Sequence, residues 1–125
     1  MSDIPVSDGG YSKYKVRLQT VQERLKALEG EFAKEGTRHL HWLCNLPAGS
    51  ITELERVLQI FAMKLEESGE YLRETGSPLP GMDKFVFDYK TVIEAYFNAI
   101  EGTIATLWAR INHVKLEESR KTNER

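Results

Sequence analysis

The sequence repeats apolar side chains at alternating spacings of three and four residues, once before residue 33 and again after residue 50. Residues three and four apart lie on one face of an α-helix, so each repeat forms one apolar stripe. An amphipathic helix of this kind buries its stripe against another helix, which predicts an all-α protein. The first stripe is Tyr11, Tyr14, Leu18, Val21, Leu25, Leu28 and Phe32, and the second is Ile51, Leu54, Leu58, Phe61, Leu65 and Leu72.

Turn-forming residues divide the chain into three long helices and one short connecting helix. A Ser50-x-x-Glu53 capping box predicts that the helix carrying the second stripe begins at Ser50. Two prolines and two glycines exclude helix from residues 76–81. The expected helices are 11–34, 40–46, 50–75 and 83–119.

The two stripes are expected to pack antiparallel within one copy, because a short connection joins them. Residues 1–10 are predicted to be a flexible N-terminal arm, since they hold turn-forming residues and little to bury. Residues 11–125 are then a single domain, an antiparallel bundle of three long helices plus the short one. We also expect this bundle to form oligomers.

The last helix carries apolar residues on almost every side, which predicts burial at the centre of an assembly. A lone copy would leave Trp108, Ile111 and Val114 partly in water, and soluble monomers usually avoid such a patch. Beside the apolar residues runs a seam of small ones, where two helices can approach closely. We therefore expect a homodimer whose interface includes Ala95, Ala99, Gly102, Thr106, Ala109, Trp108 and Ile111.

Composition narrows the protein class. The formal net charge of −2 is not that of a protein that coats DNA, which is usually basic. The lone cysteine, Cys44, cannot form an internal disulfide, so a reducing compartment is expected. The first residues lack the apolar run of a signal peptide, and no apolar stretch reaches the ~20 residues that cross a bilayer. We therefore expect a cytoplasmic protein with no membrane partner.

No motif in the sequence predicts a catalytic, cofactor-binding or metal-binding residue. His39, His41 and Cys44 are the one cluster of zinc-ligand types, and they lack the second ligand pair of a structural site. The Glu-x-x-His motif of di-iron bundles is absent, and so is a glycine-rich loop that cradles phosphate. No serine or cysteine can be paired with a base from the sequence alone.

Charge is distributed unevenly between the helices. The first half of the first helix is basic, whereas the helix after Ser50 is acidic. Basic side chains on one side of a helix contact either phosphate or an acidic neighbour. The candidate phosphate contacts are Lys13, Arg17 and Arg24.

The function that these patterns favour is a non-enzymatic helical interaction protein, either an adaptor or a small subunit of a larger complex. Its partner is then a second copy, another protein, or both. The first alternative is a small helical subunit of a nucleoprotein complex that contacts nucleic acid through the basic first helix. The second is a helical enzyme whose site converges only in three dimensions, for instance around Arg38, Arg110 and Glu101.

Overall fold

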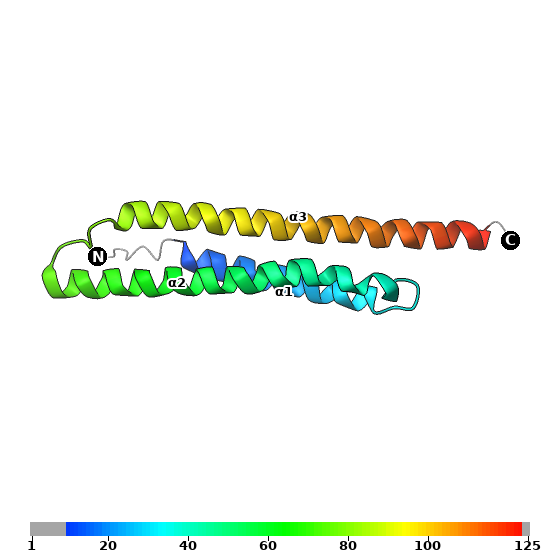
Figure 1. Cartoon of the computed structure of the whole chain (residues 1–125), viewed down its shortest axis with the longest axis horizontal. Helices are drawn as coiled ribbons and strands as arrows, with labels where there is room; N and C mark the ends of the chain where they lie inside the picture. The colour runs from blue at the N-terminus through cyan, green and yellow to red at the C-terminus, as the bar shows by residue number, and fades with distance from the viewer. Residues whose placement is uncertain (1–9, 124–125) are drawn as a thin grey trace.

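The computed structural model describes residues 10–123, and every long element in that range is an α-helix (Figure 1). The helices are α1 (Tyr11–Phe32), α2 (Asn45–Thr75) and α3 (Met82–Asn123), and the 3-10 helix η1 (Arg38–Cys44) joins α1 to α2. No strand occurs among the described residues. The predicted all-α class and three long helices are confirmed, whereas residues 1–9 of the predicted arm lie outside the described range.

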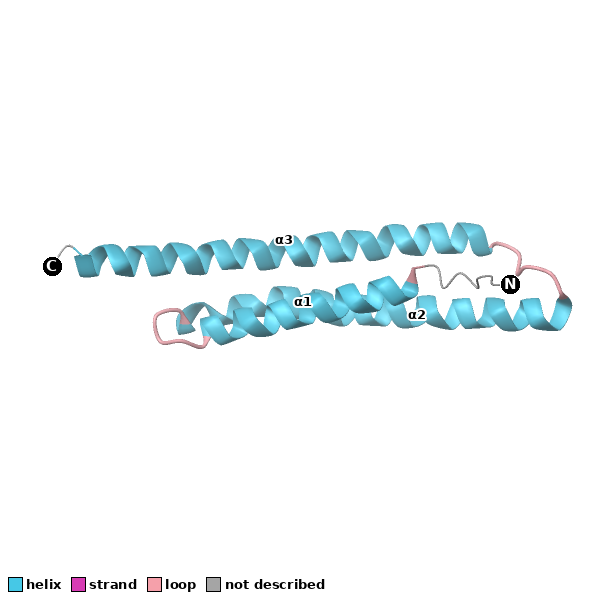
Figure 2. Ribbon diagram, turned by 180° about the vertical axis from the view of Figure 1, so that it is seen from behind, coloured by secondary structure: helices cyan, strands magenta, loops and turns pink. Residues whose placement is uncertain are grey.

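The three helices lie side by side, and each contacts the other two. α2 runs antiparallel to α1 and α3, which are parallel to each other, as both views show (Figures 1 and 2). Both predicted stripes supply the core. Val21, Leu28, Leu54 and Phe61 are fully buried, and Tyr14 of α1 packs against Phe61 of α2 at 6.3 Å between ring centroids.

The helix after η1 begins earlier than its capping box predicted. α2 starts at Asn45, so Ser50 lies inside the helix, and the predicted start at Ser50 is wrong. Pro47 lies in the first turn, where its missing N–H removes no helical hydrogen bond. Cys44, just before α2, already has helical backbone angles, so the chain passes from η1 into α2 without a break. The other end is as expected, because Gly76 closes α2 with a φ of 74° and donates its N–H to Leu72 O at 2.8 Å.

Within one copy α3 is buried on one face only, and the predicted burial of its other sides within an assembly stays a prediction. Phe87 and Val92 are 71% and 44% exposed. The buried face is a third stripe at spacings of four and three residues, formed by Ile93, Phe97, Ile100, Ile104, Leu107 and Ile111.

α3 continues through Gly102, and its C-terminal end extends past the turn between α1 and α2 (Figures 1 and 2). This extension does not expose Ile111, which is fully buried within one copy, while Trp108 and Val114 are half-buried. The expectation that a single copy leaves Ile111 in water is therefore wrong. Near this end, Lys115 of α3 pairs with Glu31 of α1 at 2.7 Å.

Candidate interaction surfaces

One helix face is exposed and uncharged over five turns. We call it the α3 outer face, and it comprises Thr91, Ala95, Ala99, Gly102, Thr106 and Ala109, all of them exposed. The predicted small-residue seam therefore faces solvent in one copy. A methyl group added at Gly102 would meet no atom of another helix within 4 Å, so no close helix contact forms there within the chain. The use of this seam between molecules stays a prediction.

The threonines of this face are satisfied within the helix. Thr91 donates its hydroxyl to Phe87 O, and Thr106 donates to Gly102 O, each at 2.9 Å. A hydroxyl that is already bonded can be covered by a partner without leaving a buried unpaired polar group. Of residues 91–109, the charged ones are Glu94 and Glu101, and both bind α1. The face can therefore be buried without removing an unpaired charge from water.

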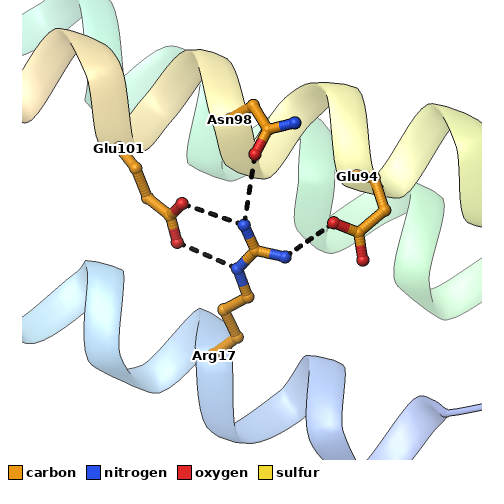
Figure 3. A network of polar contacts seen from close by, with 4 residues as sticks. All are labelled: Arg17, Glu94, Asn98 and Glu101. Carbon is orange, nitrogen blue, oxygen red and sulfur yellow. Dashed lines mark hydrogen bonds and ion pairs between the residues drawn. The ribbon is translucent and has the colours of Figure 1, made fainter.

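Those two carboxylates bind Arg17 (Figure 3). The guanidinium donates from Nε and Nη2 to the two oxygens of Glu101, each at 2.9 Å, and from Nη1 to Glu94 Oε1 at 2.8 Å. It also donates from Nη2 to Asn98 Oδ1 at 3.4 Å and lies 4.5 Å from the centroid of the Phe97 ring. A two-point arginine–carboxylate pair of this kind is among the stronger polar contacts in proteins. Hydrogen bonding to Arg17 lowers the pKa of Glu101.

Acid should therefore remove part of the stability that this pair supplies. The folded-state pKa of Glu101 lies below its ordinary value of 4.5, so the contribution is complete above that pH and is lost as pH falls through the folded pKa. Glu101→Gln should lower the melting temperature near neutral pH, and the difference from wild type should shrink below about pH 4. Thermal unfolding by circular dichroism at several pH values measures this. The Glu31–Lys115 pair is present in wild type and in the variant, so its titration does not contribute to the difference in melting temperature. A difference in melting temperature that is the same at every pH would contradict the role of Glu101.

The three candidate phosphate contacts are placed differently. Arg17 is held by the carboxylates of α3, whereas Lys13 and Arg24 are exposed. Lys13 and Arg17 line an open groove at the start of α1, together with Lys90 and Glu94, and Arg24 does not line it. Glu94 and Glu101 could not be recognised as partners of Arg17 from the sequence, which does not show which helices are neighbours.

The residues considered for chemistry do not form a recognisable reactive site. Among residues 10–123 no three His, Cys, Asp or Glu side chains are grouped to hold a metal ion. His39 and His41 are exposed, whereas Cys44 is buried and burial raises the pKa of its thiol. No hydrogen bond or ion pair within the described range links Arg38, Arg110 and Glu101, the residues named for an enzyme.

Large apolar side chains are exposed at several other places. On α2 these include Ile60 and Met63, 43% and 64% exposed, and on α1 Val16 is 65% exposed. Met63 lies in an open groove between α1 and α2 that also contains Lys15, Gln59 and Glu66. No helix within the described range is both long and apolar enough to cross a lipid bilayer.

Comparison with known proteins gives no family for this chain. No protein-family model matches it, and no curated protein or solved structure shows a significant similarity.

Proposed function

We propose that this chain is a non-enzymatic assembly protein, an adaptor or small subunit of a larger complex, that works in the cytoplasm. Its three long helices form an antiparallel bundle that serves as one folded unit. The α3 outer face of this unit packs against a second copy or another protein. The supporting observation is that this face is exposed and uncharged from Thr91 to Ala109. An exposed helix face usually carries charged residues, whereas the centres of protein interfaces are depleted in charge.

Substitutions on the α3 outer face should weaken assembly without unfolding the chain. Ala99→Arg places a long charged side chain on the face, and Gly102→Leu fills the space that a close helix contact needs. Each should weaken self-association, or capture of a protein partner, by about tenfold or more, which corresponds to ~1.4 kcal/mol. Light scattering over a concentration series gives the mass, and pull-down from the native host gives the partner.

The matched control is Ala27→Arg, which makes the same substitution at an exposed alanine of α1. It should leave the mass and the captured proteins unchanged. All three variants should remain folded by circular dichroism, because none of the three positions is buried. Unchanged assembly in both α3 variants would place the interface elsewhere.

A subunit of a nucleoprotein complex is the second candidate. The observation that favours it is the groove at the start of α1, where Lys13 and Lys90 lie together. Contact with phosphates releases counterions, so binding to an oligonucleotide would weaken steeply as salt is added. Protein capture that is insensitive to nuclease treatment, with no oligonucleotide binding, would exclude this candidate.

A further inference from the structure

A second exposed face lies between α1 and α2, and its charge is divided between the two helices. We call it the α1–α2 face. Lys15 and Lys26 of α1 are exposed and eleven residues apart, which is three helical turns and returns to the same side of a helix. Glu55 and Glu66 of α2 are also exposed and also eleven residues apart. The face therefore has a basic half and an acidic half with equal charge separations.

These charges are not neutralised across the groove within one copy. Lys15 lies over the ring of Tyr11, with Nζ 5.7 Å from the centroid, and Glu55 accepts a hydrogen bond from Gln22 at 3.0 Å. Within residues 10–123, none of the four charged residues of the face makes an ion pair. An open groove of about 350 Å³ runs between the two halves, and the exposed Met63 lies in it.

We propose that the α1–α2 face binds the same face of a second copy, through a two-fold axis parallel to the helices. Such an axis places α1 of one copy on α2 of the other, and α2 on α1. The basic half of each copy then meets the acidic half of its partner. A two-fold axis across the helices would instead place α1 on α1, where the lysines of one copy would face those of the other.

The positions of the charges along the helices agree with this arrangement. Two contacts show how α1 and α2 are aligned along the bundle axis, because Tyr14 lies opposite Phe61 and Gln22 lies opposite Glu55. Lys15 therefore lies at about the same height along this axis as Phe61 of the same copy. A rotation about an axis parallel to the helices leaves the height of every residue along that axis unchanged. Glu66 of the second copy is therefore about 7 Å along the axis from Lys15, at a rise of 1.5 Å per residue. Glu55 has nearly the same offset from Lys26, so long lysine and glutamate side chains reach both contacts together.

Met63 supplies the centre of the same contact. It is 64% exposed in one copy and lines the groove together with Lys15 of α1 and with Glu55 and Glu66 of α2. An exposed, flexible apolar side chain beside charged ones matches the usual interface, which has an apolar centre and a polar rim. This inference does not depend on the α3 outer face, because the two faces share no residue.

Charge reversal tests the pairing directly. Lys15→Glu with Lys26→Glu makes both halves of the face acidic, and Glu55→Lys with Glu66→Lys makes both halves basic. Each double variant should weaken self-association at least about tenfold in analytical ultracentrifugation, because like charges then face each other. An equimolar mixture of the two double variants should associate again, since each acidic half then meets a basic half. If the substitutions only damaged each copy by itself, mixing the two double variants would not restore association.

Arg38→Glu with Lys121→Glu is the control, because both side chains are exposed outside the face and the change in net charge equals that of the lysine double variant. It should associate as wild type does, and all variants should keep their helical circular dichroism. A wild-type monomer at high micromolar concentration would overturn the inference, and so would double variants that remain associated or do not associate when mixed. Association that resists charge reversal and is lost in Ala99→Arg would overturn this inference alone, leaving the proposed function intact.

Discussion

Ile111→Asp should unfold much of the protein, although Ile111 lies near the end of the core. The side chain is fully buried in one copy, between helices whose facing residues are apolar. A carboxylate there would be buried without a partner, and the methylene groups of isoleucine would be lost as well. We expect a loss of about 4 kcal/mol or more, which is at the upper end for single substitutions. Urea unfolding followed by circular dichroism measures the free energy of unfolding.

The matched control introduces the same carboxylate one residue further along. Asn112 is exposed, so Asn112→Asp should change stability by less than about 0.5 kcal/mol. If Ile111→Asp stays folded and only its mass changes, the side chain belongs to an interface between copies, as the sequence first suggested. If both variants are equally stable, the last helix is not packed at this level.

Phe61→Ala should produce a loss of about 3–5 kcal/mol, the usual cost of deleting a buried aromatic side chain. Phe61 is fully buried, and its ring lies 6.3 Å from Tyr14, 6.3 Å from Phe85 and 6.2 Å from Tyr89. The substitution leaves a cavity where all three helices meet. Differential scanning calorimetry or urea unfolding gives the change in stability.

Phe87→Ala removes the same side chain from a position that is 71% exposed. Its effect should stay within about 0.5 kcal/mol, because little burial is lost. A large loss at Phe87 that appears only in concentrated protein would show that a second copy covers that position. A small loss at Phe61 would contradict the core itself.

The stripes of α1 and α2 could be predicted because periodicity decides which residues face inward. Val21, Leu25, Leu54 and Leu58 are buried as that spacing requires. Leu72, at the end of the second stripe, is 49% exposed, because α1 begins at Tyr11 and does not reach its level. A stripe in the sequence thus identifies a face, whereas the length of the neighbouring helix decides how much of that face is covered.

The face of α3 was harder to predict because apolar residues also flank its stripe. Phe87 and Val92 obscure the three–four spacing that runs from Ile93 to Ile111, although that spacing is present in the sequence. The start of α2 was missed for a different reason. A capping box is a local signal, and the helical backbone of η1 made a separate start at Ser50 unnecessary.

Which residues form the candidate surfaces depends on which helices are neighbours. The sequence does not show this, so the surfaces could be predicted only in part. The exposed seam from Ala95 to Ala109 could be listed in advance, but whether it lay inside one copy required the structure. The partners of Arg17 could be found only once α1 and α3 were known to be parallel neighbours. The seven-residue separation of Glu94 and Glu101, on one side of a helix, was the available signal.

That separation has a consequence for how the helices are aligned. Apolar stripes that repeat every seven residues fit together almost equally well after a slip of one repeat, so packing alone defines the register of α1 on α3 weakly. Arg17 lies between two carboxylates that are themselves one repeat apart. A slip in either direction would keep one carboxylate near the guanidinium and leave the other unpaired at a half-buried position. The cluster thus favours one alignment of α1 on α3 among several that the packing of the core distinguishes only weakly.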